Sequence, residues 1–414
     1  MTKIQKRLLI IGKVWPEPDS SAAGSRMMEL IHLFIEQNWE VTFATAAAKS
    51  QFVADLEVHG VNSVSIKLND ASFDAFISGL NPDIVLFDRF MTEEQFGWRV
   101  AEQCPDALRV LDTEDLHCLR EARHTALKNG REFEQTDLLN DHAKREIASI
   151  LRCDLSLIIS SYEMDVLKHV FRVDESLLMH LPFMLDEISV NVVTNWIPYD
   201  KRNHFISIGN FLHAPNWDAV LFLKEEIWPI IHEQLTGSEL HIYGAYPTQK
   251  VEQLHNPDQG FLVKGRAEDA KEVVRNSRVL LAPLRFGAGL KGKLIEAMQC
   301  GTPCVTTEIG AEAMHGNLLW PGFIENDPKR FASKAVELYS NLLKWEQAQK
   351  NGVEIINRLY PKNELGGKLL ERIRQILKDL GSYRQRNFVG QILQHHTTAS
   401  TKYMSKWIEA KNKP

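Results

Sequence analysis

Ten apolar runs of strand length, alternating with segments of helical period, are the feature that most restricts the fold of this 414-residue chain. Continuous apolar strands separated by helices are typical of parallel sheets that helices cover on both faces. The pattern therefore predicts an α/β protein built from doubly wound, Rossmann-like sheets. The runs are 7–12, 40–45, 83–88, 108–113 and 155–160, then 204–209, 239–244, 260–265, 278–284 and 303–310.

The two series of runs are separated by residues 181–203, a stretch poor in helical period and rich in turn residues. Because the chain is too long for one core, two domains are expected. We place the first in residues 1–190 and the second in residues 200–380. Residues 385–414 read as helix with amphipathic pieces, and we expect them to cross back and complete the first domain. A surface helix is the alternative for this tail.

Composition removes several classes of function. The formal net charge is -6 with both signs mixed along the chain, which argues against nucleic acid as a partner. No apolar run reaches the roughly 18 residues of a membrane span, and the short run near the start reads as a first strand rather than a signal peptide. The five cysteines include no CxxC pair, so we expect reduced thiols in the cytoplasm and neither a disulfide frame nor structural zinc.

A candidate binding segment lies at 285–301, RFGAGLKGKLIEAMQCG, between an expected strand and an expected helix. Ligands of open parallel sheets bind at such strand ends, and a helix start offers N–H groups to phosphate. Gly287 and Gly289 would let an anion approach the backbone. Lys293 and Glu296 share a helix face, which suits a nucleotide diphosphate: the cation toward the phosphates, the carboxylate toward the ribose hydroxyls. An exposed Lys–Glu pair is the alternative.

The wider segment 282–314 resembles the nucleotide-sugar-binding segment of the retaining glycosyltransferases of family 4, also called group 1. Its neighbours 205–231, 240–245 and 263–269 fit the same family in order. The resemblance implies two Rossmann-like domains facing across a cleft, the GT-B fold. It also implies a donor site on the second domain and an acceptor site on the first.

The resemblance assigns roles in the second domain. Glu296 matches the carboxylate that holds the donor ribose, and Lys293 or Lys291 matches the cation at the diphosphate. Arg266 lies where the family's loop meets the base, and Arg285 is a further candidate cation. The donor-binding residues implied are Gly209, Asn210, His213, Gly244, Arg266, Arg285, Gly287, Ala288, Gly289, Leu290, Lys291, Lys293 and Glu296.

Two departures from the family concern the donor. Many members have a second glutamate eight positions before the ribose one, where it contacts the transferred sugar, and Ala288 stands there in this chain. Many also have an arginine and a lysine after the first strand of the donor domain. Here that loop offers Asn210, His213 and Asn216 instead, so lysines 291 and 293 would have to supply the positive charge.

In the first domain, residues 111–121 look like the loop where related transferases hold a histidine near the reacting sugar, which makes His117 the candidate. Glu114 is a candidate on the acceptor side, although Asp112, Glu114 or Asp115 could equally cap the following helix. A structural or exposed histidine is the alternative for His117. Together with Lys293 and Glu296, His117 forms the predicted catalytic set.

Gly24 and Arg26 stand at another helix entry, where family members contact acceptor or diphosphate, with a capped helix start as the alternative. Asp88 and Arg89 close a further strand and rank lower. The pair His395–His396 lacks partner ligands at a fitting spacing, so no metal site is expected.

The resemblance implies transfer of a sugar from a nucleotide diphosphate sugar to an acceptor, with retention of anomeric configuration. We expect no obligatory cofactor or divalent metal, because the protein supplies the positive charge. A nucleotide-sugar epimerase and a non-catalytic nucleotide-sugar-binding protein are the alternatives; a nicotinamide oxidoreductase lacks its GxGxxG motif. The sequence leaves open the donor, the acceptor, the oligomeric state and peripheral docking at the inner membrane surface.

Overall fold

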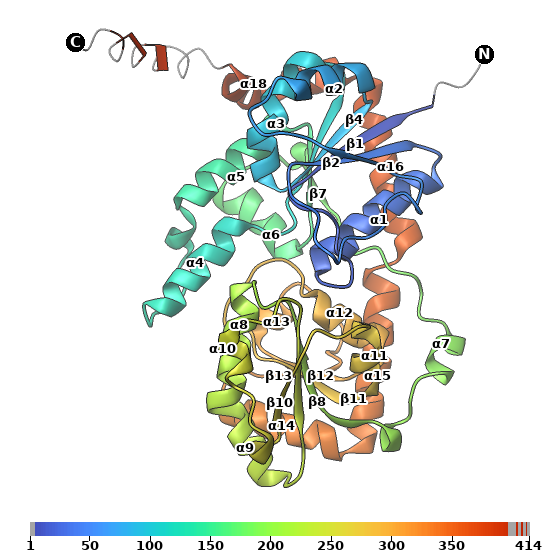
Figure 1. Ribbon diagram of the computed structural model, residues 1–414, viewed down its shortest axis with the longest axis vertical. Helices are drawn as coiled ribbons and strands as arrows, with labels where there is room; N and C mark the ends of the chain where they lie inside the picture. The colour runs from blue at the N-terminus through green and yellow to red at the C-terminus, as the bar shows by residue number, and fades with distance from the viewer. Residues whose placement is uncertain (1–4, 396–402, 405–406, 409–410, 412–414) are drawn as a thin grey trace.

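The computed structural model describes residues 5–395, 403–404, 407–408 and 411, which contain one parallel sheet in each half of the chain (Figure 1). The first sheet has the strand order β3-β2-β1-β4-β5-β6-β7. Its strands are β1 Arg7–Gly12, β2 Glu40–Thr45, β3 Asn62–Ser65, β4 Ile84–Asp88, β5 Leu108–Asp112, β6 Leu155–Ile158 and β7 Leu178–His180. The helices between them are α1 Ala22–Glu36, α2 Ser72–Leu80, α3 Phe90–Gln103, α4 His117–Lys128, α5 Asp141–Arg152 and α6 Ser161–Asp165.

The second sheet has the order β10-β9-β8-β11-β12-β13. Its strands are β8 Asn203–Ile208, β9 Leu240–Tyr243, β10 Phe261–Gly265, β11 Ser277–Ala282, β12 Cys304–Thr306 and β13 Gly322–Ile324. The helices of this half, with α7 in the linker, are α7 Val190–Thr194, α8 Ala214–Phe222, α9 Trp228–Gln234, α10 Gln249–Glu252, α11 Ala270–Asn276, α12 Gly292–Gln299, α13 Glu308–Ala311, α14 Pro328–Ser340 and α15 Leu342–Leu359. In both sheets the order reverses beside the first strand of the sheet, which is where doubly wound proteins bind ligands.

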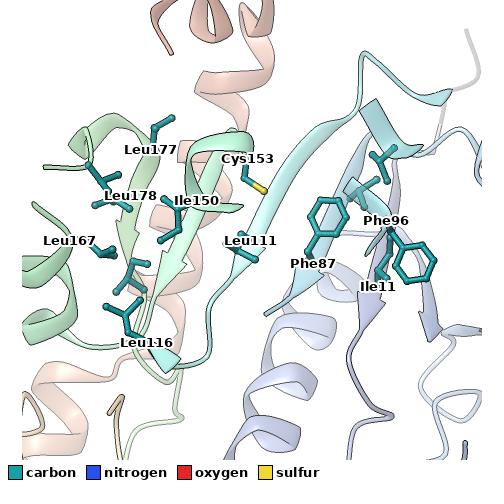
Figure 2. Packing of buried hydrophobic residues seen from close by; sticks show 14 of the residues in the cluster. Ile11, Phe87, Phe96, Leu111, Leu116, Ile150, Cys153, Leu167, Leu177 and Leu178 are labelled. Carbon is teal, nitrogen blue, oxygen red and sulfur yellow. The ribbon is translucent and has the colours of Figure 1, made fainter. Parts of the chain in front are cut away.

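The continuous apolar runs exist because each sheet is buried on both faces. In β1, Leu9 and Ile11 belong to one buried cluster, whereas Leu8 and Ile10 belong to the cluster on the opposite face. Figure 2 shows part of the first of these clusters, in which the side chains of Ile11, Phe87 and Phe96 lie close together. The predicted fold class, α/β with two Rossmann-like sheets, is confirmed.

All ten predicted strands are present, but β3, β7 and β13 were not predicted. Each of the three lies at an edge of its sheet. The residues of β3 are exposed or half-buried, and β7 and β13 have three residues each. A short edge strand needs no continuous apolar run, so its sequence carries little signal.

The chain returns to the first sheet through α16 Lys362–Lys378 (Figure 1). Its residues Leu369, Ile373 and Ile376 are buried in the same cluster as Leu8 and Ile10 of β1. The helix therefore packs with the first half of the chain, although the sequence assigned residues up to 380 to the second domain.

The two segments that connect the halves are joined to each other. The backbone N–H of Leu185 donates to the carbonyl of Tyr360 (2.8 Å), and the N–H of Lys362 donates to the carbonyl of Leu185 (2.9 Å). The outward and returning connections therefore form one hydrogen-bonded unit at the boundary between the halves.

Two further helices, α17 Leu380–Arg386 and α18 Phe388–Gln394, lie against the first half. Arg384 pairs with Asp154 at 2.7 Å, and the side-chain amide of Asn387 donates to the carbonyl of Leu151 at 2.7 Å. Part of the tail predicted at 385–414, including His396, lies outside the described residues, namely at 396–402, 405–406, 409–410 and 412–414.

Candidate active site

The candidate site is a cleft of about 1140 Å³ between the two halves. Its second-domain wall comes from α12 and from the loops after β8, β9, β10 and β11, and the strand order reverses between β8 and β11. Its first-domain wall comes from the loops after β1, β4 and β5 and from α1. The cleft thus lies at the carboxyl ends of the strands of both sheets, where the topology of each predicts a ligand.

Lys293, in the first turn of α12, is positioned by the loop after β8. Its Nζ donates to the side-chain oxygen of Asn216 at 2.8 Å, and the amide of Asn216 donates to the carbonyl of Asn210 at 2.8 Å. A Cβ on Gly209 would lie 2.8 Å from both Asn216 and the Lys293 amine, so a larger residue would displace these two side chains. Burial lowers the pKa of Lys293 to about 8, which leaves it mostly charged at neutral pH.

Lys291 is the residue immediately before α12 and is almost fully buried. Its Nζ donates to the carbonyl of Gly289 at 2.7 Å, which folds the side chain back onto its own loop. Burial lowers its pKa to about 8, as for Lys293. Both amines line the cleft at the start of a helix, so they add to the positive end of the helix dipole.

Glu296 lines the same cleft one turn after Lys293. Burial raises the pKa of its carboxyl to about 7, and the nearby cation of Lys271 opposes that rise. The resulting series is a helix start with N–H groups, two amines and then a carboxylate. This arrangement can bind a diphosphate and, next to it, a vicinal diol.

The opposite end of the second-domain wall meets the first domain. The guanidinium of Arg266 lies 4.0 Å from the ring centre of Phe52, and the hydroxyl of Tyr246 donates to Glu17 at 2.8 Å. Gly244 is required because a Cβ there would lie 2.2 Å from the carbonyl oxygen of Gly209. Arg266 thus borders the cleft with a flat aromatic neighbour.

The first-domain wall carries the loop between β5 and α4. Glu114 has a left-handed backbone (φ 63°) and lines the cleft. His117 also lines it, 3.5 Å from Asp115. Burial lowers the pKa of His117 to about 4, so the ring is neutral at pH 7. Asp115 also pairs with Arg120, a cleft residue not predicted from the sequence.

Contacts across the domain boundary hold the loop at 286–290. Arg123 of α4 donates to the carbonyl of Gly287 at 2.9 Å and pairs with Glu312 at 2.6 Å. The ring of His124 stacks on Phe286 with centroids 4.4 Å apart. The loop at 286–290 therefore packs against helix α4 of the first domain.

The structure brings most of the predicted site residues into one cleft. The predicted residues that line it are Gly209, Asn210, His213, Gly244, Arg266, Gly287, Ala288, Gly289, Leu290, Lys291, Lys293, Glu296, Glu114 and His117.

Three predicted residues lie outside that lining. Arg26 is fully buried and pairs with Asp112 at 2.9 Å. Gly24 packs against the backbone of Glu17, where a Cβ would clash at 2.4 Å. Arg285 pairs with Asp218 instead (Nε to Oδ2, 2.9 Å). Gly24 and Arg26 thus pack within the first domain and do not line the cleft.

Sequence reasoning missed Arg120 and Glu163 and ranked Arg89 low. Arg120 follows His117 by three residues on α4, so helical spacing could have found it. Glu163 reaches the site only through the fold, because its contacts are with Leu116 and Gly289. No pattern in the sequence around Glu163 predicts such a contact.

Two further observations concern metals and membranes. Within the described ranges, no group of three or more His, Cys, Asp or Glu side chains could hold a metal ion. The helices of the described chain include none that is both long enough and apolar enough to cross a bilayer.

Comparisons with known proteins agree with this geometry. Residues 202–341 match the family model described as "Glycosyl transferases group 1". No curated protein sequence matches the chain. The match covers the loops after β8 and β11 and the whole of α12, and it identifies the second domain as that of a transferase enzyme.

Solved structures share the fold over nearly the whole chain at low identity. A glycosyltransferase from Rickettsia africae ESF-5 is 13% identical, with a TM-score of 0.65, covering 91% of this chain and 100% of that one. Sucrose-phosphate synthase from Thermosynechococcus elongatus is 14% identical, with a TM-score of 0.66 and coverages of 90% and 100%. Anabaena Alr3699/HepE, solved in complex with UDP and glucose, is 12% identical, with a TM-score of 0.65 and coverages of 88% and 99%. These likenesses confirm the GT-B fold.

Proposed function

We propose that this protein transfers a sugar from a nucleotide diphosphate sugar to an acceptor, with retention of anomeric configuration. The observation that carries the proposal is the start of α12, where Lys293 and, one turn later, Glu296 face a cleft between two Rossmann-like domains. The group 1 match covers this helix, and a protein of the same fold has been solved with UDP and glucose. The donor base, the sugar and the acceptor are not part of the proposal.

Stabilisation of the leaving diphosphate is the proposed main source of catalysis. Two amines and the N–H groups of the helix start would neutralise the charge that develops on the leaving oxygen. The contacts of Arg123 and Tyr246 across the boundary would keep the cleft closed during transfer. Because the protein supplies this positive charge, we propose that turnover needs neither a divalent metal nor another cofactor.

We propose that the second domain, residues 200–360, binds the donor. The first domain, residues 1–190 with the returning helices, would bind the acceptor. His117 is the proposed catalytic group on that side, because it is neutral at pH 7 and lines the cleft opposite α12. The five free cysteines, all buried, favour a reducing compartment such as the cytoplasm.

The test is a thermal-shift and calorimetric panel of UDP, GDP and ADP, each free and as a sugar conjugate. We expect one base to bind, and Glu296→Ala to weaken that ligand at least tenfold while its far-UV spectrum stays that of the wild type. Failure of every nucleotide to bind the wild type would refute the proposal. Incubation of donor alone, followed by product analysis, separates transfer from epimerisation, and the anomeric coupling constant of the product reports retention. Undiminished turnover in EDTA is expected.

A further inference from the structure

Arg89 has an unusual backbone at the edge of the cleft. It stands between β4 and α3 with φ 69° and ψ 156°, a region that glycine adopts and that residues with a Cβ avoid. Its N–H donates to the carbonyl of Asp112 at 2.8 Å, which holds it in place. Strained backbone of this kind clusters at ligand-binding sites, where the surrounding structure holds the residue in an unfavourable conformation.

The guanidinium of Arg89 has no hydrogen-bond acceptor among the described residues. Its ion contact is with Asp88, at 3.6 Å, longer than a hydrogen bond. Only 20% of the side chain is exposed, and it lines the cleft. Arg26 and Arg123, by contrast, pair with carboxylates at 2.9 and 2.6 Å. A largely buried guanidinium with five free donors fits the oxygens of a phosphate or carboxylate.

The carboxylates near Arg89 are mostly occupied by other cations. Asp112 is paired with the fully buried Arg26, and Asp115 with Arg120. Each of these acids therefore has a closer cation than Arg89, although the charges of both also reach Arg89.

The two remaining acids near Arg89 are Glu114, which is half-buried, and Asp88, which is buried. Burial, followed by the charge of Asp112, raises the pKa of Glu114 well above its usual value, which favours the neutral form. Burial also raises the pKa of Asp88, whose Oδ2 already accepts from the N–H of Lys13 at 2.9 Å. Burial opposes the charge of Arg89, but Asp88, Glu114, Asp115 and Asp112 together raise its pKa, so the guanidinium stays fully charged.

The surroundings of Arg89 point toward the donor site. Arg120 and His117 lie with Arg89 on the first-domain wall of the cleft, and the positive charge of Arg89 acts to lower the pKa of both. Burial lowers the pKa of His213, from the loop after β8. The charges of Arg120 and Arg89 from one domain and of Lys293 from the other lower it further. Cations of both domains therefore converge on the space around His213.

We propose that Arg89 is an oxyanion-binding residue of the first domain, which holds a phosphate or carboxylate of a substrate in the cleft. The inference rests on the proposed function, since that substrate is either the donor, through its diphosphate, or an acceptor that carries an anion. Arg89 lines the same cleft as Lys293 and His213 of the second domain. Closure of the domains would bring the two sets of cations to one anion.

Two substitutions separate binding from folding. Arg89→Lys keeps the charge but loses the planar fork, and Arg89→Gly removes the side chain while suiting the backbone angles. We expect Arg89→Gly to melt at or above the wild-type temperature. Arg99→Lys is the matched control, because Arg99 lies on α3, the helix that Arg89 precedes, pairs with Asp74 and does not line the cleft. If Arg89→Gly melts lower, Arg89→Lys alone decides.

The measurements are calorimetric titrations with UDP, GDP and ADP, and a titration of the nucleotide-saturated protein with inorganic phosphate. A tenfold or larger loss of nucleotide affinity in both Arg89 variants assigns the anion to the donor. Unchanged nucleotide affinity with loss of phosphate binding assigns it to an acceptor. Unchanged binding of both ligands overturns the proposal. If the wild type binds no nucleotide, the proposed function fails, and the phosphate titration of the free protein still decides the role of Arg89.

Discussion

Glu163 of the first domain accepts a hydrogen bond from the backbone N–H of Gly289 in the second, at 2.8 Å. The same carboxylate oxygen also accepts from the N–H of Leu116 at 2.9 Å, directly before His117. One fully buried side chain therefore fixes the loop after β11 to the loop after β5. The two loops carry the proposed donor and acceptor residues, so Glu163 sets the distance between them.

Loss of Glu163 should destabilise the closed arrangement. In Glu163→Ala two buried N–H groups lose their acceptor, each at about 1–3 kcal/mol, so we expect the free energy of unfolding to fall by at least about 2 kcal/mol. Glu163→Gln keeps the accepting oxygen and should stay near the wild type at pH 4.5. Urea unfolding of the three proteins measures both values. Equal stability of the Ala variant and the wild type would contradict the role.

The same pair predicts a pH dependence of stability. Burial raises the pKa of Glu163 to about 8, above its usual 4.5, so the folded state holds this proton more tightly than the unfolded state. Its contribution is fully present below pH 4.5 and is lost as the pH rises to about 8. We therefore expect Glu163→Gln to gain stability relative to the wild type across that window and then to level off. A constant difference from pH 5 to pH 9 would refute this.

Lys293→Met should separate activity from stability. Methionine keeps the stem but removes the charge beside the proposed diphosphate, which should lower the rate of transfer about 100-fold. Stability should stay within about 1 kcal/mol, because a charge whose burial already lowers its pKa to about 8 is removed. Lys350→Met, at an exposed position on α15, is the control. A rate within threefold of the wild type would exclude Lys293 from the diphosphate site.

Glu296 should make donor binding depend on pH near neutrality. Burial raises the pKa of Glu296 to about 7, and the carboxylate form is the better acceptor for ribose hydroxyls, so nucleotide affinity should fall as the pH drops from 8 to 6. UDP and 2′-deoxy-UDP, or the equivalents of the preferred base, should differ about 10–100-fold in the wild type, the value of a hydrogen bond to a charged group. Glu296→Gln should flatten the pH profile and shrink that difference. Equal discrimination by both proteins would place the ribose elsewhere.

Ala288→Glu should not restore a family-like donor contact. Ala288 packs against the buried cluster of the first domain, and the neighbouring Gly289 leaves no space, since a Cβ there would lie 2.9 Å from that of Asp115. A longer, charged side chain would push the loop off that surface, at about 1–3 kcal/mol for overpacking alone. We expect weaker domain closure, seen as a larger radius of gyration in solution scattering, and lower activity. Ala288→Ser is the matched small substitution, and a more active Glu variant would contradict this prediction.

The sequence predicted the elements whose burial shows in the pattern of neighbouring residues. Most of the ten strands were found because both of their faces are covered, as Leu8 and Leu9 of β1 illustrate. The helix start at Lys293 and the turn to Glu296 were found for a similar reason, because glycine spacing and helical period are local properties. The edge strands, half-exposed and short, carry no such pattern.

Contacts between distant segments escaped prediction. The family resemblance placed Arg26 near the acceptor or diphosphate, but its partner Asp112 lies 86 residues away and holds it in the core. Arg285 is likewise turned aside by Asp218. Such outcomes depend on which opposite charge the fold brings near, and spacing along the chain does not contain that information.

The return of α16 to the first sheet has a consequence for biosynthesis. A nascent chain leaving the ribosome exposes Leu8 and Ile10 of β1 long before Leu369 and Ile373 exist to cover them. The second domain, by contrast, has all its strands and α15 by residue 359. The second domain can therefore finish folding while one apolar face of the first sheet is still exposed. This is the reverse of the usual N-terminal-first order. Ribosome stalling or truncation before residue 362 should thus leave a chaperone-binding, aggregation-prone first domain beside a finished second one.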